Sequence, residues 1–480
     1  MSSGKGVRPG GGVRPGKGAS RSASASPNET ERQRAARELR EIEAAIFGRR
    51  NEGHVDPSNE RMQALVDLLG DPQRAYRGIH LTGTNGKTST ARMIDELLRG
   101  FGVRTGRYTS PHLSKVTERI VVDGEPISDS RFVEGYRQIA PLIGLVDARS
   151  AVPLSFFEIV TALAFSIFAD VPIDVAVVEV GMGGTWDNTN VLDAEIAVVT
   201  PIALDHTRYL GTTVEQIATE KAGIIKTDAI AVLAAQPNDA VPPLLERAVA
   251  VGASVAREGL EFGVSERRLA VGGQFLTLQG LGGTYDEIFL PLHGKHQAQN
   301  AALALAAVEA FLGAGAAQGA IDADVVCEAF AHVSSPGRLE PLRSAPTILL
   351  DAAHNPAGLR ATLEAVAEEF SFRRIVAVLG VLEDKDVDGM LELLEPAVDE
   401  LIVTETSSSR AMPADELAAR AVPLFGAERV VVEPRLDDAL ETAVRLAEDA
   451  GDEVLVGSGV LVVGSVVTAG EARVLLGGRQ

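Results

Sequence analysis

The chain is poor in cysteine and in aromatic residues. Its 480 residues include one cysteine, Cys327, and aromatic residues make up 4% of the sequence. A single cysteine cannot form an internal disulfide bond or a multi-cysteine metal site, so we expect a reducing, cytoplasmic setting. Because Cys327 falls in a helix-like run (324–332), we expect it to be a buried structural thiol. With 45% hydrophobic residues, the cores must be built mainly from alanine, valine and leucine.

The chain also lacks an excess of positive charge. Its formal net charge is −21, although the first 28 residues carry five basic residues and no acidic one. General binding to nucleic acid or to an anionic membrane needs a basic face, so the sequence disfavours both as partners. A small anionic substrate remains compatible, because a local basic cluster can oppose the global charge.

No stretch has the composition of a membrane span or of a signal peptide. The longest apolar run, 454–470, is interrupted by glycine and serine and predicts core strands. The amino-terminal stretch lacks an apolar central segment. We therefore expect a protein without a membrane partner. We also expect a monomer, since one chain of this length can form a complete cleft.

The length of the chain predicts at least two domains. Residues 1–30 are rich in glycine, serine, arginine and proline and predict a disordered basic tail, with a partner-binding arm as the alternative. From residue 31 apolar strands alternate with amphipathic helices, which predicts an α/β fold with parallel sheets covered on both faces. The segment 334–338, Ser-Ser-Pro-Gly-Arg, interrupts a helical region. We therefore place a catalytic domain at 31–334 and a doubly wound α/β domain at 335–480.

The expected elements can be given by residue number. One interval, 253–292, contains short alternating pieces and many glycines, and predicts a small antiparallel excursion. The predicted strands are 78–82, 174–180, 196–201, 229–234, 347–350, 375–380, 400–404, 429–432 and 453–456. The predicted helices include 155–169, 298–312 and 357–369.

The stretch 80–89, His-Leu-Thr-Gly-Thr-Asn-Gly-Lys-Thr-Ser, leads from a strand through a glycine-rich turn into a helix. Glycines allow positive φ and let backbone N–H groups approach phosphate oxygens, and the helix N-terminus adds positive potential. Lys87 can reach the terminal phosphates, while Thr88 or Ser89 can offer a hydroxyl to phosphate or Mg²⁺. The usual pattern has glycine where this chain has Leu81. The sequence predicts a nucleotide-phosphate cradle made of Gly83, Thr84, Asn85, Gly86, Lys87, Thr88 and Ser89.

Three ionisable residues follow predicted elements at the carboxyl edge of the sheet, where open parallel sheets bind ligands. Glu179 ends one strand and could hold the Mg²⁺ that bridges nucleotide phosphates, or pair with a surface lysine. His206 follows the next strand and could be a metal ligand, a phosphate contact or a structural histidine. Lys221 could be a solvated helix lysine, but a lysine with a lowered pKa can react with carbon dioxide to give a carbamate ligand.

Further polar residues suggest nucleotide handling. Asn300 belongs to an amide-rich helix start, Gly-Lys-His-Gln-Ala-Gln-Asn. Asp351 and His354 follow a strand of the second domain, and Arg338 lies in the linker, where it could reach phosphate when the domains close. Taken one at a time, each is equally compatible with a surface position.

Ten motifs occur along the chain in an order typical of one family. They are Leu-Gly-Asp-Pro-Gln (69–73), Thr-Gly-Thr-Asn-Gly-Lys (82–87), Ser-Pro-His-Leu (110–113), Phe-Glu (157–158), Glu-Val-Gly-Met-Gly-Gly (179–184), Asp-His (205–206), Glu-Lys-Ala-Gly (220–223), His-Gln-Ala-Gln-Asn (296–300), Pro-Gly-Arg (336–338) and Asp-Ala-Ala-His-Asn-Pro (351–356). With them, residues 35–470 resemble the folylpolyglutamate synthase and dihydrofolate synthase family, and more distantly the Mur peptide ligases.

The resemblance implies roles for individual residues. A first Mg²⁺ would be held by Ser110 and Glu179, and a second by His206 and a carbamylated Lys221. The nucleotide contacts that it implies are Asn300, Arg338 and Asp351, and we expect His354 to help bind ATP or glutamate. The substrate contacts would be Asp71, Pro72 and Gln73 in a loop over the pterin, the aromatic wall of Phe156 and Phe157, and Glu158, Gly184, Thr185, Trp186 and Asp187.

Two positions depart from the family pattern. Thr88 stands where the family often has glycine, which is closer to the Mur ligases. Thr185 stands where the family often has arginine, so one pterin or carboxylate contact is missing.

The implied activity is ATP-dependent ligation of L-glutamate to a folate or to dihydropteroate through an acyl phosphate. A Mur-type ligase acting on a UDP-linked cell-wall precursor is the nearest alternative. A non-catalytic nucleotide-binding protein is another, although Glu179, His206 and Lys221 would then have no metal to hold.

Overall fold

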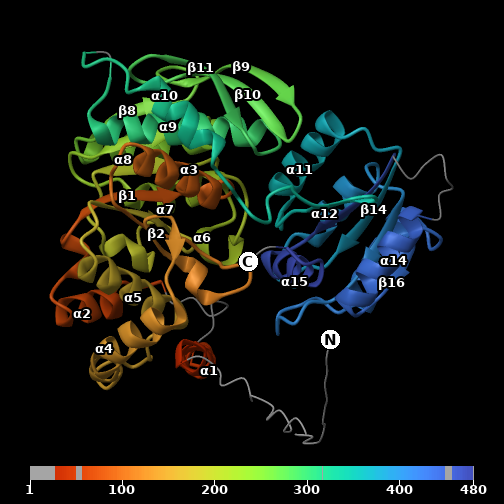
Figure 1. Ribbon diagram of the computed structural model, residues 1–480, viewed down its shortest axis with the longest axis horizontal. Coiled ribbons are helices and arrows are strands. Elements are labelled where there is room, and N and C mark those ends of the chain that lie inside the picture. The colour runs from red at the N-terminus through yellow and green to blue at the C-terminus, as the bar shows by residue number, and fades with distance from the viewer. Residues whose placement is uncertain (1–26, 50–56, 316, 449–456, 479–480) are drawn as a thin grey trace, which may run out of the picture.

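The computed structural model describes residues 27–49, 57–315, 317–448 and 457–478. Their strands form three sheets, of eight, three and six strands (Figure 1). The eight-stranded sheet has the order β4-β3-β2-β5-β1-β6-β7-β8. Its strands are β1 (Arg77–Thr82), β2 (Thr105–Tyr108), β3 (Ile120–Val122), β4 (Glu125–Pro126), β5 (Val175–Glu179), β6 (Ile196–Val199), β7 (Ile230–Leu233) and β8 (Ser254–Arg257).

Strand β1 lies between β5 and β6 and is parallel to both. Six strands, from β2 to β8 along the sheet, run parallel, whereas β3 and β4 pair antiparallel at one edge. The loops that follow β1, β5 and β6 therefore leave the same edge of the sheet. This edge is the one that binds ligands in open parallel sheets.

Helices cover both faces of this sheet, because successive strand residues point to opposite sides. On β5, Val175 and Val177 pack toward α3, α9 and α10, whereas Ala176 and Val178 pack toward α4 and α5. The first group is α3 (Lys87–Gly100), α9 (Lys295–Leu312) and α10 (Ala323–Ala331). The opposite side carries α1 (Pro27–Phe47), α2 (Glu60–Leu68), α4 (Asp129–Asp147), α5 (Phe156–Asp170), α6 (Thr207–Leu210), α7 (Val214–Lys221) and α8 (Val241–Ala250).

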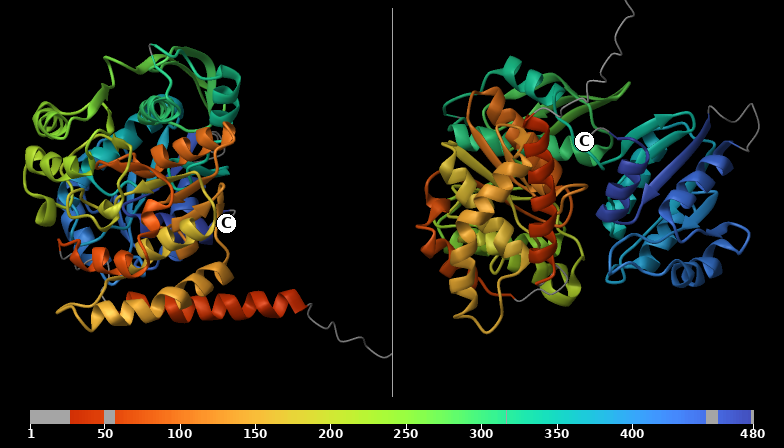
Figure 2. Two further views of the ribbon diagram at one scale, coloured as in Figure 1. Left: turned by 90° about the vertical axis from the view of Figure 1, so that its left-hand side faces the viewer. Right: turned by 60° about the horizontal axis from the view of Figure 1, so that its bottom comes forward.

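Short 3₁₀ turns connect several of these elements. They are η1 (Pro72–Arg74), η2 (Val116–Arg119), η3 (Asn188–Val191), η4 (Ala222–Ile224) and η5 (Asn238–Ala240). Helix α1 lies along α4 below the body of the domain (Figure 2). No described helix is long and apolar enough to cross a bilayer.

The three-stranded sheet is antiparallel and packs on α9 and α10. The buried carboxylate of Glu309, on α9, connects this sheet to the helix. It accepts hydrogen bonds from Tyr285 Oη at 2.7 Å and from the backbone N–H of Gly282 at 3.0 Å. Its strands are β9 (Gly263–Ala270), β10 (Gly273–Gln279) and β11 (Thr284–Leu290).

The six-stranded sheet belongs to a separate lobe and has the order β12-β13-β17-β14-β15-β16, with only β12 antiparallel (Figures 1 and 2). The strands are β12 (Glu340–Ser344), β13 (Thr347–Leu350), β14 (Arg374–Leu379), β15 (Glu400–Val403), β16 (Val430–Val432) and β17 (Ser458–Val463). One face packs on α11 (Pro356–Glu369), α12 (Val387–Leu394) and α13 (Ala414–Phe425), and the other on α14 (Leu436–Glu448) and α15 (Val466–Leu475).

The α/β fold class predicted from the sequence is confirmed, with differences in detail. The apolar run 454–470 is only partly strand, because β17 ends at Val463 and α15 begins at Val466. The antiparallel excursion begins at β9, since β8 belongs to the parallel sheet. Helix α1 begins at Pro27, inside the predicted tail, whereas residues 1–26 and the predicted strand 453–456 lie outside the described residues. Cys327 is half-buried, with Sγ near the carbonyl of Asp286.

Candidate active site

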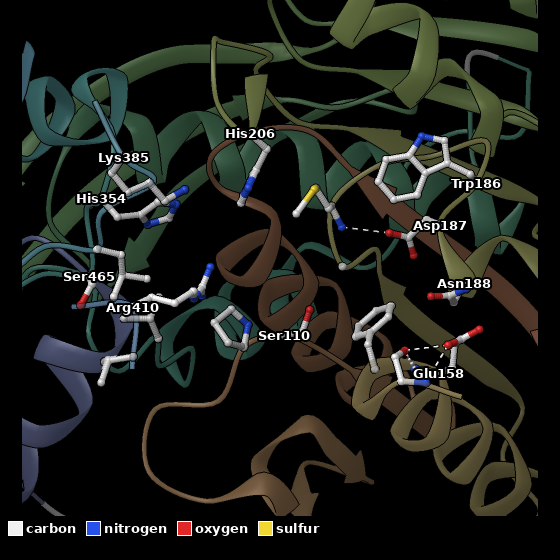
Figure 3. A pocket seen from close by; sticks show the side chains of 18 of the residues that line it. Ser110, Glu158, Trp186, Asp187, Asn188, His206, His354, Lys385, Arg410 and Ser465 are labelled. Atoms are coloured by element: carbon white, nitrogen blue, oxygen red, sulfur yellow. Dashed lines mark hydrogen bonds between the residues drawn. The ribbon is translucent and has the colours of Figure 1, made fainter. Parts of the chain in front are cut away.

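A cavity of about 240 Å³ opens between the two lobes at the carboxyl edges of their sheets. Figure 3 shows side chains from both lobes facing it: Ser110, Glu158, Trp186, Asp187 and His206 from the first, and His354, Lys385, Arg410 and Ser465 from the second. The two lobes therefore share one candidate site.

The predicted phosphate cradle has the required backbone geometry. Gly83 and Gly86 have φ values of 136° and 90°. A Cβ on Gly83 would lie 1.9 Å from Thr200 Oγ1, and one on Gly86 would lie 2.6 Å from Asn300 Oδ1. Both positions thus need glycine for conformation and for space.

Lys87 begins α3 and folds back over the turn. Its Nζ donates to the carbonyls of Gly83 at 3.2 Å and Thr84 at 3.0 Å. Burial lowers the pKa of Lys87, and the negative charge of Glu179 opposes this shift. The ammonium group is therefore held where a phosphate could replace the carbonyl oxygens. Ser89 points elsewhere, since its Oγ lies 3.0 Å from Ser335 Oγ in the linker.

Glu179 combines with Thr88 and Ser110 as the first candidate metal site. Its buried carboxylate accepts from Thr88 Oγ1 at 3.0 and 2.9 Å and from the backbone N–H of Ser110 at 3.4 Å. Burial raises the pKa of Glu179, while the nearby Lys87 lowers it. Carboxylate and hydroxyl oxygens are the hard ligands that Mg²⁺ prefers, so these residues fit the predicted ion.

The second candidate metal site is less complete. Burial lowers the pKa of His206 to about 3, so its imidazole is neutral and able to ligate. Lys221 Nζ is buried and donates to the Met182 carbonyl at 2.8 Å. Among the described residues no group of three or more histidine, cysteine, aspartate or glutamate side chains could hold a metal ion. A second Mg²⁺ at His206 would thus depend on converting Lys221 into a carbamate, which remains a prediction.

Asp205, next to His206, joins the two lobes. Its carboxylate accepts from Lys385 Nζ at 2.7 Å and from Asn355 Nδ2 at 3.0 Å, with His354 Nε2 at 3.4 Å. Burial would raise the pKa of Asp205, but the hydrogen bond from His354 and the charge of Lys385 hold it well below the usual range. These contacts close the lobes around the cavity.

The cradle also takes part in this closure, because the Asn85 and Asn355 amides exchange two hydrogen bonds of 3.1 Å. Asn300 lies against Gly86 and donates to Gln297 Oε1 at 3.1 Å. The positive charge of Arg338, in the linker, lowers the pKa values of Lys87 and Glu179.

Asp351 has a different position from the predicted nucleotide contact. Its carboxylate accepts from the backbone N–H groups of Leu339 at 2.7 Å and Ala353 at 2.8 Å and from Thr362 Oγ1 at 3.1 Å. These bonds hold the linker turn against the second lobe. Asp351 therefore supports the linker turn and does not line the cavity.

Part of the predicted substrate wall lines the cavity. Phe157, Glu158, Trp186 and Asp187 are among its lining residues. Glu158 forms a capping box with Ser155 at the start of α5 and accepts from Arg61 Nε at 3.0 Å. These contacts fix the amino end of α5 at the cavity.

Other predicted substrate residues lie behind this wall. Phe156 is fully buried, with the Arg119 guanidinium 5.0 Å from its ring centroid. Gly184 and Thr185 pack against α7, where Gly184 N donates to Glu220 Oε1 at 3.0 Å and Thr185 N to the Glu220 carbonyl at 2.9 Å. They support the cavity without lining it.

Asp71, Pro72 and Gln73, predicted to form a loop over the pterin, do not line the cavity. These residues belong to η1 and its approach, and Asp71 and Pro72 border a separate hollow with Ser166 and Asp170. That hollow lies at the carboxyl end of α5, whereas the cavity lies at its amino end. The substrate role of this loop therefore remains a prediction.

The cavity residues that the sequence reasoning missed include Arg61, Lys385, Arg410 and Ser465. Lys385 and Ser465 follow β14 and β17, at the carboxyl ends of two neighbouring parallel strands. The strand-end rule used for Glu179 could have found both. Arg61 and Arg410 stand in a helix and a loop with no comparable signal.

Comparison with known proteins defines the class first. The Mur ligase middle domain matches residues 155–308, and the Mur ligase glutamate ligase domain matches residues 337–460. The two α/β lobes that meet at the shared cavity are thus the domains of a Mur-type ligase.

Individual relatives then define the family. The chain is 52% identical to the dihydrofolate synthase/folylpolyglutamate synthase of Mycobacterium tuberculosis, over 92% of this chain and 94% of that protein. A structure of folylpolyglutamate synthase from that organism with ADP matches with a TM-score of 0.89, 52% identity and coverage of 93% and 99% of the two chains. A second structure of folylpolyglutamate synthase from that organism, with ADP and AMPPCP, matches with a TM-score of 0.88 and 51% identity over the same shares of the two chains. The chain belongs to the dihydrofolate synthase/folylpolyglutamate synthase family.

Proposed function

We propose that this protein is an ATP-dependent carbon–nitrogen ligase that adds L-glutamate to folates and to dihydropteroate, with two Mg²⁺ ions. The observation that carries the proposal is the shared cavity, in which Lys385, Arg410 and Ser465 of the second lobe face Ser110 of the first. Ser110 is joined to the phosphate cradle, because Glu179 accepts from the backbone N–H of Ser110 and from Thr88 Oγ1. Membership of the family, and the ADP and AMPPCP in its solved members, support ATP as the nucleotide.

The first step joins two anions and needs charge cancellation. The substrate carboxylate attacks the γ-phosphate of ATP, which gives an acyl phosphate and ADP. Lys87 would hold the phosphates, and the N-terminus of α3 would face them. Mg²⁺ on Glu179, Thr88 and Ser110 would supply further positive charge at the phosphate oxygens.

The second step needs glutamate beside the activated carbonyl. Its amine attacks the acyl phosphate, an amide bond forms and phosphate leaves. Lys385, Arg410 and Ser465 lie on the second lobe within the same cavity and suit the two carboxylates of glutamate. Closure by the Asp205 contacts would exclude water, which otherwise hydrolyses the acyl phosphate.

The aromatic side chains of Phe157 and Trp186, which line the cavity, suit a pterin ring. We further propose that the protein acts as a monomer in the cytoplasm, without a nucleic-acid or membrane partner. The acidic net charge of −21 and the cavity formed within one chain support this.

The test is ADP release by the purified protein with ATP, Mg²⁺, bicarbonate and L-glutamate, offering dihydropteroate and tetrahydrofolate in separate reactions. Turnover with both supports the dual activity, and turnover with one assigns that step. Release only with a UDP-linked muropeptide precursor would replace the proposal with the Mur-type alternative. The Lys87→Ala variant should fold and lose turnover, because the phosphates lose their cation; normal turnover would overturn the cradle.

A further inference from the structure

His80, on β1, is a buried histidine that the proposed reaction does not use. Its ring is inaccessible to solvent, and burial together with the charge of Lys226 lowers its pKa to about 3, so the imidazole is neutral. Its Nε2 atom lies 2.8 Å from the buried Thr189 Oγ1, while Nδ1 has no hydrogen-bond partner among the described residues. A buried polar ring beside the phosphate cradle requires a physical reason.

The direction of these hydrogen bonds follows from Thr189. Its hydroxyl donates to Asp187 Oδ1 at 2.6 Å, because an ionised carboxylate can only accept. The hydroxyl has one proton, so it must accept from His80, and His80 Nε2 carries the hydrogen. A buried chain of donors therefore runs from His80 through Thr189 to Asp187.

Asp187 connects this chain to the glycine loop, residues 181–184. Its second oxygen, Oδ2, accepts from the backbone N–H groups of Met182 at 2.9 Å and Gly183 at 3.2 Å. Its first oxygen, Oδ1, also accepts from the backbone N–H of Thr189 at 3.1 Å, so each carboxylate oxygen accepts two hydrogen bonds within the protein. The carbonyl of Met182 in turn accepts from Lys221 Nζ at 2.8 Å.

The same loop is also bonded from α7. Glu220 Oε1 accepts from the N–H of Gly184 at 3.0 Å and from that of Trp186 at 3.1 Å. Trp186 lines the cavity (Figure 3). The place of its indole and of the Lys221 amine thus depends on how the loop is held between β1 and α7.

We propose that His80 is a positioning residue, which holds the glycine loop through Thr189 and Asp187. The loop then fixes Lys221 and the cavity face of Trp186. The effect of His80 on the rate of ligation rests on the proposed function, whereas its effect on the position of the loop does not.

The test compares three variants of this chain with one control. His80→Leu and Thr189→Val each remove one link at similar volume, and His80→Gln keeps an N–H near the place of Nε2. Thr105→Val is the control, because Thr105 is a buried threonine of the same sheet that donates to a carboxylate, Asp95, at the opposite edge. Trp186 is the only tryptophan of the chain, so its emission reports on the loop.

We expect His80→Leu and Thr189→Val to shift the Trp186 emission and to lower kcat roughly 10- to 100-fold, the range typical for outer partners of a catalytic site. His80→Gln should restore most of both, and the double variant should lose no more than either single one, because one chain is broken only once. Thr105→Val should keep the wild-type emission and kcat.

Wild-type emission and kcat in His80→Leu and Thr189→Val, with only a loss of melting temperature like that of Thr105→Val, would overturn the proposal. If His80→Leu fails to fold, Thr189→Val decides. If the wild-type protein shows no ligase turnover, the proposed function fails, and the emission of the variants still tests the positioning role.

Discussion

At the scale of single residues, the pKa of Lys221 leads to a testable dependence of stability on pH. Burial lowers its pKa from 10.5 to about 7. Below about pH 7 the Lys221 amine is protonated in both the folded and the unfolded chain, so burying its charge lowers the free energy of unfolding by the full amount. Between pH 7 and 10.5 the unfolded chain binds more protons, so the free energy of unfolding rises with pH. Lys221→Met should therefore stabilise the protein more at about pH 6 than at about pH 9.5.

Urea unfolding at both pH values in bicarbonate-free buffer measures this difference. The exposed Lys115 provides the matched control, since Lys115→Met should change stability little and equally at the two pH values. An equal gain at both pH values in Lys221→Met would show that the amine keeps its ordinary pKa. In bicarbonate, mass measurement of the wild-type protein tests the carbamate directly.

The sequence could locate Glu179, His206 and Lys221 because each follows an element that ends at one edge of the sheet. It could not give their environment. The low pKa of Lys221 comes from its burial and from the nearby charge of Lys87. The Met182 carbonyl that accepts from Lys221 is itself held by the bond from Met182 N–H to Asp187. The sequence also could not show that both carboxylate oxygens of Asp187, a predicted substrate contact, already accept hydrogen bonds within the protein.

At the scale of elements, the turn between β1 and α3 can be compared with the end of α3. Gly86 and Gly102 both have positive φ, 90° and 75°. Only Gly86 has close neighbours, because an added Cβ would meet Asn300 Oδ1 at 2.6 Å there and nothing within 4 Å at Gly102. Either change to alanine should cost about 1–2 kcal/mol of stability, because a left-handed conformation is unfavourable for a residue with a Cβ. Only Gly86→Ala should also weaken ADP binding.

Calorimetric titration of ADP into both variants measures this contrast. Gly102→Ala should bind as the wild-type protein does, because its turn lies at the far end of the helix. Equal affinities in the two variants would mean that the turn at Gly86 does not approach the phosphates.

The elements that could be predicted are those with long apolar runs, such as β1, β5 and β6. Among the missed strands, β2, β3 and β4 are short, and β2 and β4 include glycine, arginine or proline. The sequence also does not show which end of α5 the predicted pterin loop meets. The 15 residues of α5 separate its ends by about 22 Å, and η1 lies at the end away from the cavity.

At the scale of the whole molecule, the sequence predicted two lobes but not the residues that join them. Lys385 and Asp205 are 180 positions apart, and their side chains form a 2.7 Å bond with both groups nearly buried. Breaking one side of a buried pair typically costs about 3–5 kcal/mol, because it leaves an uncompensated charge. Lys385→Met should therefore favour a more open arrangement of the lobes.

An open cleft admits water to the acyl phosphate, so Lys385→Met should release ADP with little amide product, whereas the wild-type protein should form the two in equal amounts. Small-angle X-ray scattering with ADP should give a larger radius of gyration for the variant. The control is Lys295→Met, which makes the same change at an exposed lysine and should keep product formation coupled to ADP release. Coupled turnover at a reduced rate in Lys385→Met, with an unchanged radius, would assign Lys385 to binding glutamate and leave closure to the Asn85–Asn355 contact.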